Sequence, residues 1–89
     1  MTQVGEIDYT IIVPAFNEEE YLPATLQSLN ACMDRMEDAT GEIIVVDNNS
    51  DDRTALVAKS SGARVVHEEI RGIGRARNSG AEQARGQVF

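Results

Sequence analysis

The sequence predicts an α/β domain with a parallel sheet and flanking helices. Short apolar runs alternate with helical patterns in the order β-α-β-α-β-α-β, which is typical of parallel strands joined by right-handed crossovers. One run, residues 43–46, has four apolar residues without alternation, as expected of a strand covered on both faces. Polar residues directly follow the first two strands. Together these observations predict a parallel sheet with helices on its faces.

The first strand and the first helix are expected over residues 9–36. Residues 9–13 form a β-branched run closed by Pro14, which predicts a short strand. Pro23 suits the first turn of the helix that follows, where its missing N–H costs little. Cys32 falls within the helical pattern and is expected to be a small core or boundary residue. One apolar stripe, with its two methionines as core filling, is formed by Leu22, Leu26, Leu29, Met33 and Met36.

The second strand leads through a polar turn into a short helix. Residues 47–52 form the turn, and the helix is expected from Arg53 to Ser60. Ser50 and Asp51 are the natural N-cap candidates, and Gly62 is the expected stop.

The third strand and the third helix complete the pattern. Residues 63–67 predict the strand, and the helix is expected from about Gly74 to Arg85. A narrow stripe of small residues would let this helix lie close to the sheet; it comprises Ala76, Gly80 and Ala84. Gly86 ends the helix, and residues 87–89 begin a fourth strand.

Composition is that of a small folded domain. The chain has 89 residues, of which 42% are hydrophobic, so it should fold with modest burial and marginal stability. Its net charge is −7, which excludes a general nucleic-acid binder because such proteins present a basic face. A phosphate-bearing small ligand stays compatible with this charge, since local basic groups or a metal can override the overall field.

The expected location is the cytoplasm. Residues 1–6 contain neither the basic stretch nor the apolar stretch of a secretory signal. No apolar run approaches the roughly 18 residues of a membrane span. The single Cys32 cannot form an internal disulfide, which fits a reducing compartment. Association of a longer parent protein with the cytoplasmic face of a membrane stays open.

Several familiar ligand motifs are excluded. Gly72-Ile73-Gly74 lacks the third glycine of a dinucleotide fingerprint because position 77 is Arg, and no P-loop sequence occurs. Residues 47–58 begin like a calcium loop but lack its glycine and its final glutamate. His67, the one histidine, is expected at the surface end of a strand and cannot form a zinc site alone.

Polar segments gather where the strands are expected to end. Ligands of open parallel sheets bind at the carboxyl ends of the strands, and residues 14–18, 47–50 and 71–78 should meet there. Their carboxylates and amides can accept hydrogen bonds from base N–H groups and ribose hydroxyls. Their arginines can hold phosphate oxygens through a two-pronged fork. The expected ligand is therefore a nucleotide.

Three ordered motifs resemble family 2 glycosyltransferases of the GT-A type. Residues 12–19, Ile-Val-Pro-Ala-Phe-Asn-Glu-Glu, are similar to the opening motif of that family. Residues 44–54 resemble its second motif, and residues 72–86 resemble its third. Each motif is weak alone, but the ordered set spans nearly the whole chain from Tyr9 and is a strong signal.

The resemblance implies a Rossmann-like half that binds the nucleoside diphosphate of an activated sugar. Pro14, Phe16 and Glu18 would surround the base and ribose, with Asp47 beside them. Arg77 would lie near the phosphates or the base edge, while two further residues would shape its loop. The residues so implied in nucleotide binding are Pro14, Phe16, Asn17, Glu18, Asp47, Asn48, Ser50, Gly74, Arg77 and Asn78.

Simpler roles remain open for some of these residues. Asn17 and Ser50 could only cap helices, and Asp47 could only fix its turn. Many family members carry a second Asp where this chain has Asn48. An amide retains an acceptor oxygen but adds a donor and loses the charge, which leaves the identity of the base open.

The resemblance also implies a partial domain, residues 1–89, truncated at the start of its fourth strand. In the family, an Asp-x-Asp motif that holds Mg²⁺ or Mn²⁺ and a carboxylate base come later, so no catalytic residue and no metal ligand is expected within this chain. The parent would invert the anomeric carbon by in-line displacement, and the chain alone would be inactive. Self-association through the open edge is also expected.

Two other functions compete with this interpretation. A self-contained, non-catalytic nucleotide-binding or regulatory α/β module would have the same fold, and fold alone cannot separate the two. A receiver-like signalling domain needs a lysine on a later strand. Lys59, the single lysine, falls instead on the second helix, which ranks this alternative last.

Overall fold

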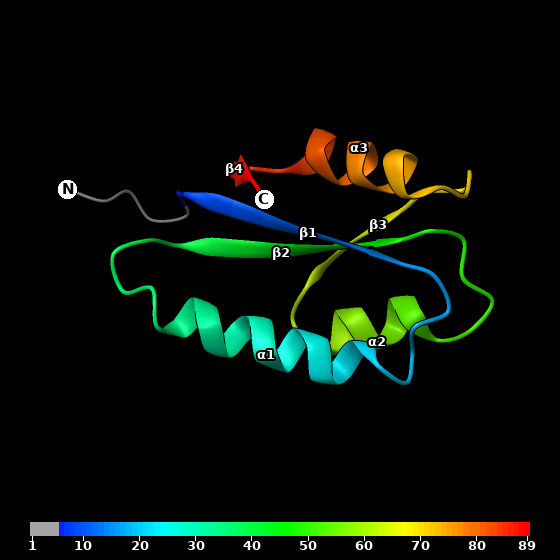
Figure 1. Cartoon of the computed structure of the whole chain (residues 1–89), viewed down its shortest axis with the longest axis horizontal. Helices are drawn as coiled ribbons and strands as arrows, with labels where there is room; N and C mark the ends of the chain where they lie inside the picture. Colours follow the sequence, from blue (N-terminus) through cyan, green and yellow to red (C-terminus); the bar gives the residue numbers. More distant parts are fainter. Residues whose placement is uncertain (1–5) are drawn as a thin grey trace.

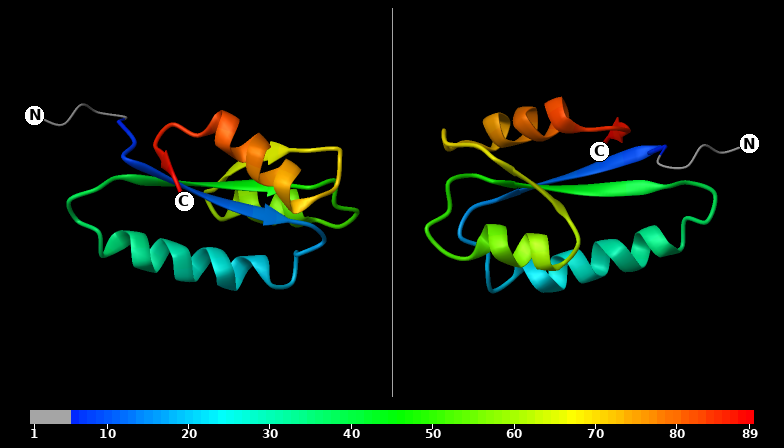
Figure 2. Two further views of the ribbon diagram at one scale, coloured as in Figure 1. Left: turned by 45° about the horizontal axis from the view of Figure 1, so that its top comes forward. Right: turned by 180° about the vertical axis from the view of Figure 1, so that it is seen from behind.

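A parallel sheet lies between two layers of helices in the computed structural model, which describes residues 6–89. Helices α1 and α2 cover one face of the sheet, and α3 covers the other (Figures 1 and 2). Residues 1–5, on which the prediction that no secretory signal is present largely depends, lie outside the described residues. The elements are β1 (Tyr9–Ala15), α1 (Leu22–Asp34), β2 (Gly41–Asp47), α2 (Thr54–Ser60), β3 (Arg64–His67), α3 (Ile73–Gln83) and β4 (Gln87–Val88).

The sheet has the order β3-β2-β1-β4, and all its strand pairs are parallel. This confirms the predicted α/β class with a Rossmann-like arrangement. Ala15 pairs with Asp47, and Asp47 pairs with His67, so three strands end at the same edge. The loops that follow them are therefore neighbours.

Strand β1 continues through Pro14, two residues beyond the predicted strand. The Thr10 carbonyl and the Ile12 N–H bond to the backbone of Phe89 on the β4 side. Bonding direction alternates along a strand, so the nitrogen of Pro14 faces that same side. Since no strand within residues 6–89 pairs there, proline costs the sheet no hydrogen bond.

The helices on the two faces of the sheet contribute side chains of different size to the core. On the α1–α2 face, Leu22 and Leu26 pack against Ile43 and Val45. On the α3 face, Ala76 packs against Ile44 and Val46. A Cβ added at Gly80 would lie 2.7 Å from the Ile12 Cγ2 atom, so α3 approaches the sheet as the small-residue stripe predicted.

Two predictions about α1 are wrong. Met36 is exposed, because the helix ends at Asp34 and Met36 follows it in the connection to β2. Cys32 is also exposed, because it lies about 100° around the helix from Met33. Met33 itself is partly buried against the core, as expected.

The predicted caps and ends of the other helices need correction. The N-cap of α2 is Arg53, without a side-chain cap, because the Ser50 and Asp51 atoms bond to the β1–α1 loop instead. Gly62 follows α2 with φ +87° and confirms the expected stop. Helix α3 ends at Gln83, two residues early, because Ala84 takes an extended conformation.

At the amino end of the sheet, Glu42 of β2 connects its own strand to three other parts of the chain. Its carboxylate accepts hydrogen bonds from the Thr10 hydroxyl at 2.8 Å, the Arg64 guanidinium at 2.7 Å and the Arg85 backbone N–H at 2.9 Å. Burial alone would raise the pKa of Glu42, but these bonds outweigh it and hold the pKa below its ordinary value. The node joins β1, β2, β3 and the segment that leads into β4.

Candidate functional site

Three loops meet at the carboxyl ends of β1, β2 and β3. A shallow cavity of about 290 Å³ opens between them, lined by Pro14, Ala15, Phe16, Glu18, Asn48 and Ile73. A larger hollow of about 610 Å³ lies between α2 and β3, near Leu56 and Lys59. That hollow contains none of the polar residues that end the strands. The smaller cavity is therefore the candidate site.

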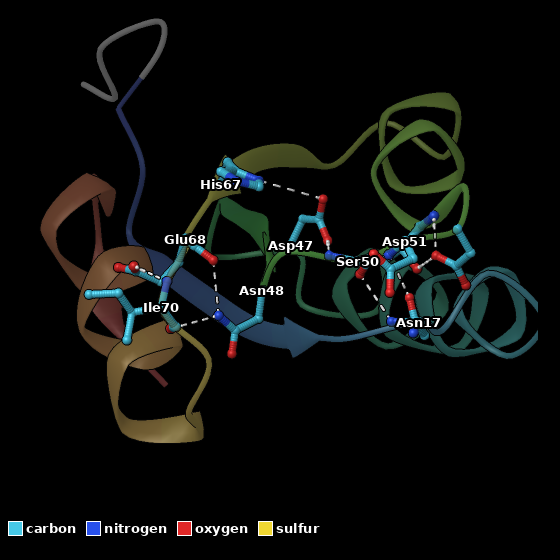
Figure 3. A network of polar contacts seen from close by, with 10 residues as sticks. Asn17, Asp47, Asn48, Ser50, Asp51, His67, Glu68 and Ile70 are labelled. Atoms are coloured by element: carbon cyan, nitrogen blue, oxygen red, sulfur yellow. Dashed lines mark hydrogen bonds and ion pairs between the residues drawn. The ribbon is translucent and has the colours of Figure 1, made fainter.

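The β1–α1 and β2–α2 loops are joined by reciprocal hydrogen bonds. The Asn17 backbone N–H donates to the Ser50 hydroxyl at 2.9 Å, and the Asn17 side-chain oxygen accepts from the Asp51 N–H at 2.8 Å (Figure 3). Asn17 holds a left-handed φ of 50°, which asparagine tolerates better than most residues. Asn17 and Ser50 therefore connect two loops; neither caps a helix.

Asp47 stands at the end of β2 and is buried. One carboxylate oxygen accepts the Ser50 N–H at 3.1 Å, so Asp47 does fix its own turn. The other oxygen lies 3.8 Å from Nδ1 of His67 (Figure 3). His67 is exposed at the end of β3, as predicted. Thus only one of the two carboxylate oxygens of Asp47 accepts a hydrogen bond from the backbone.

Asp52 and Thr54 form a second link that sequence reasoning missed. Thr54 is fully buried; its hydroxyl accepts the Glu18 N–H at 2.9 Å and donates to Asp52. Asp52 also accepts the N–H groups of Thr54 and Glu19. Partial burial would raise the pKa of Asp52, but these bonds outweigh it and lower the pKa. The spacing of an Asp two residues before a Thr is a local signal that could have revealed this turn.

Asn48 holds the β3–α3 loop. Its side chain is buried, with a relative exposure of 6%. The amide nitrogen donates to the carbonyls of Glu68 at 3.0 Å and Ile70 at 2.9 Å (Figure 3). The amide oxygen accepts the Gly72 N–H at 2.9 Å. Asn48 borders the cavity, yet its polar atoms are used mainly by this loop.

Glu68, the first residue after β3, supports the same loop, and sequence reasoning also missed it. Its carboxylate accepts the Ser79 hydroxyl and, at 3.0 Å, the Ile70 N–H. The bond from Ser79, followed by that from Ile70, holds the pKa of Glu68 below its ordinary value. The loop is thus tied to β2 through Asn48 and to α3 through Ser79.

Arg71 lies at the tip of this loop and reaches the other two. Its guanidinium carbon lies 4.1 Å from the centroid of the Phe16 ring, a cation–π distance. One guanidinium nitrogen lies 3.8 Å from an Asp51 carboxylate oxygen. Because Phe16 lines the cavity and is 39% exposed, Arg71 places a positive charge at the cavity wall. Arg71 was expected only as part of a phosphate-binding segment, without a role of its own.

The remaining predicted residues lie on α3 and do not join the cavity. Arg77 lines a separate hollow of about 280 Å³ with Ile12, Val88 and Phe89. The side chains of Ile12 and Pro14 lie on the same face of the sheet. This hollow, lined by Ile12, is therefore on the same face as the cavity, which is lined by Pro14, and lies farther along β1. Asn78 is exposed on α3. A Cβ at Gly74 would meet nothing within 4 Å, so space does not require glycine there.

Two findings concern what residues 6–89 contain. No three His, Cys, Asp or Glu side chains in this part of the chain gather as a metal site would require. None of its helices combines the length and apolar character needed to cross a bilayer.

Comparisons with known proteins point to one family. The family model described as Glycosyl transferase family 2 matches residues 10–89. An uncharacterized glycosyltransferase of Mycobacterium bovis is 44% identical over 71 residues, which cover 80% of this chain and 29% of that protein. The chain thus spans less than a third of the length of this relative.

Solved structures give the same result. Mannosyl-3-phosphoglycerate synthase from Rubrobacter xylanophilus is 27% identical, with a TM-score of 0.78 over 92% of this chain and 29% of that one. Glucosyl-3-phosphoglycerate synthase from Mycobacterium tuberculosis, solved with Mn²⁺, UDP and glucosyl-3-phosphoglycerate, is 30% identical. Its TM-score is 0.62 over 79% of this chain and 27% of that one.

Proposed function

Because the chain belongs to glycosyl transferase family 2, we propose that its strand-end cavity binds the nucleotide of a nucleoside diphosphate sugar. The whole protein would transfer the sugar to an acceptor with inversion. The observation that carries the proposal is the cavity itself, where the Phe16 ring, the Glu18 segment and the strand end at Asn48 converge. The M. tuberculosis relative, solved with UDP and Mn²⁺, supports a nucleotide of this kind.

The groups at the cavity suit the parts of such a ligand. The Phe16 ring carries Arg71 over one face, and the part of the ring that lines the cavity can contact a base. Carboxylates at Glu18 and Asp47 can accept hydrogen bonds from base N–H groups and ribose hydroxyls. Arg71 supplies a guanidinium at the wall, and Arg77 lies farther along the same side of β1 for a phosphate.

The chemical step belongs to the whole protein. We expect Mg²⁺ or Mn²⁺ on the diphosphate and a carboxylate base for the acceptor hydroxyl. The described residues do not fit a metal, because no three His, Cys, Asp or Glu side chains among them form a ligand group. On its own, the 89-residue chain is expected to release no nucleoside diphosphate from nucleotide sugars. Protein-dependent turnover above the blank would contradict this.

Ligand titration with NMR detection tests the site. UDP and GDP, added separately to ¹⁵N-labelled chain, should bind with affinity around the millimolar range, about −4 kcal/mol. Amide shifts should cluster at Phe16, Asp47 and Asn48, with smaller ones at Arg77. The signal of Met33, near the C-terminal end of α1, should not shift. Amide shifts confined to residues such as Met33, or the absence of any shift, would contradict the proposal.

A matched pair of variants sharpens the titration. Phe16→Ala removes the aromatic wall and should weaken UDP binding several-fold, since base–aromatic stacking is worth about 1–3 kcal/mol. Leu56→Ala removes an exposed apolar side chain on α2 that does not line the cavity, and should leave binding unchanged. Equal losses in both variants would show that the effect is not local to the site.

Location and assembly complete the proposal. We expect the reaction to take place in the cytoplasm, where nucleotide sugars would be available. Copies of the chain are expected to associate beside β4, where Val88 and Phe89 are exposed. Sedimentation over a concentration series measures this. A monomer at every concentration would contradict the association alone.

A further inference from the structure

We propose that Asn48 is a positioning residue, which holds Arg71 against Phe16 so that the Arg71 guanidinium meets the diphosphate of the nucleotide. The inference rests on the proposed function and adds to it a route from a buried amide to the ligand.

The environment of Asn48 demands a donor. Its amide nitrogen is 3.0 Å from the Glu68 carbonyl oxygen and 2.9 Å from that of Ile70. A carboxylate in the same place accepts hydrogen bonds and donates none. It would leave both carbonyls facing a negative oxygen, buried next to the cavity, and the loop would have to move.

These bonds bracket Arg71 in the sequence. Asn48 binds the carbonyl of the residue before Arg71 and the N–H of the residue after it, Gly72. The backbone on both sides of Arg71 is thus fixed to the end of β2. This fixed backbone aims the guanidinium at the Phe16 ring, 4.1 Å away.

A cation in this place matters because the surroundings are acidic. The chain has a net charge of −7, and Glu18, Asp47 and Asp51 all lie at this edge. A diphosphate would be repelled there unless a positive charge compensates. Arg71 has five N–H donors, and its nearest carboxylate, on the 83%-exposed side chain of Asp51, is at 3.8 Å, so donors remain for phosphate oxygens.

A double-mutant cycle with two ligands tests the inference. Affinities for UDP and for uridine are measured for the chain itself, Asn48→Asp, Arg71→Gln and the double variant. Asn48→Asp should weaken UDP binding about fivefold or more, but uridine binding less than about twofold. In the Arg71→Gln background, the same substitution should weaken UDP binding less than about twofold, because the residue through which it acts is gone.

Controls separate charge and folding from positioning. Asn49→Asp adds the same charge one residue away on an exposed side chain and should change UDP binding less than about twofold. If Asn48→Asp shows no cooperative thermal transition, Asn48→Ser replaces it, since a hydroxyl can still donate to one carbonyl.

The outcomes distinguish the two proposals. If the unmodified chain binds neither UDP nor GDP, the proposed function fails and this inference falls with it. If it binds UDP but the two substitutions act additively, or if uridine loses as much affinity as UDP, only the positioning role is overturned. A non-additive loss confined to UDP supports it.

Discussion

The two ends of the sheet use buried polar side chains in different ways. At the amino end, Glu42 is 9% exposed and binds atoms of β1, β3 and the segment before β4. At the carboxyl end, Asn48 and Asp47 are equally buried, but their partners lie in loops. The groups around them, such as Arg71 at 56% exposure, remain open to solvent.

This difference separates stability from binding. Breaking a set of hydrogen bonds among sheet elements should lower the free energy of unfolding and leave ligand affinity almost unchanged. A node among loops sets where exposed groups stand, so breaking it should change ligand affinity as well. Substitutions at the two ends should therefore differ in kind even where they remove similar hydrogen bonds.

The largest effect is expected for Glu42→Ala. Removal of the carboxylate leaves the Thr10 hydroxyl and the Arg85 N–H without their acceptor, and the Arg64 guanidinium keeps only a backbone carbonyl. The free energy of unfolding should fall by about 2–4 kcal/mol, measured by urea denaturation. Nucleotide affinity of the remaining folded protein should be unchanged. The exposed Glu82→Ala on α3 serves as control, and a loss as small as in that variant would show that the node contributes little.

Acid should remove a smaller part of the same stabilisation. The pKa of Glu42 is lower in the folded protein than its ordinary value, as are those of Asp52 and Glu68. Depressed pKa values stabilise the fold above the unfolded pKa, and this contribution is lost as pH falls through the folded pKa. The thermal midpoint should hence decline below about pH 4.

The variant Glu42→Gln assigns this acid response. This variant should have a lower thermal midpoint at pH 7. Its midpoint should also decline less as pH falls, because one of the three carboxyl groups with a lowered pKa is absent. Glu82→Gln should follow the unmodified chain. Parallel curves for Glu42→Gln and the unmodified chain would mean that Glu42 is not among the groups that set acid stability.

Thr54→Val tests the carboxyl end of the sheet, because it removes the hydroxyl and keeps nearly the same side-chain shape. The Glu18 N–H loses its acceptor and Asp52 loses a donor, at a cost of about 1–2 kcal/mol in unfolding free energy. Because Glu18 lines the cavity, UDP affinity should fall too, unlike in Glu42→Ala. Thr25→Val, on an exposed face of α1, is the matched control. Unchanged affinity in Thr54→Val would remove the distinction between the two ends.

The elements of the fold were predictable because their signals are local. The unbroken apolar run of β2 and the small-residue stripe of α3 both follow from residues a few positions apart, and the structure confirms both. The exposed Met36 shows the limit of such patterns. Periodicity gives the direction of a side chain, but not the point where a helix leaves the surface it covers.

The site was predictable as a place but not as a network. Strand ends identified the three segments that meet. The bonds between them join residues far apart in sequence, as in the link from Asn17 to Asp51 or from Asn48 to Ile70. No local pattern encodes such pairs. The bonds of Asn48 to the β3–α3 loop and the contact of Arg71 with Phe16 therefore depend on how the folded loops lie together.

The smallest effect is expected for Tyr9→Phe, at the amino end. The Tyr9 hydroxyl is buried and has no hydrogen-bond partner among residues 6–89, while its ring packs directly over Gly41. Burial of an unpaired hydroxyl is unfavourable, so removing it should leave stability unchanged or raise it by up to about 1 kcal/mol. Urea denaturation measures this, with the exposed Tyr21→Phe as control. A loss of stability specific to Tyr9→Phe would reveal a partner for the hydroxyl. The amino end would then contain a second polar node beside Glu42, and its role would be broader than one carboxylate.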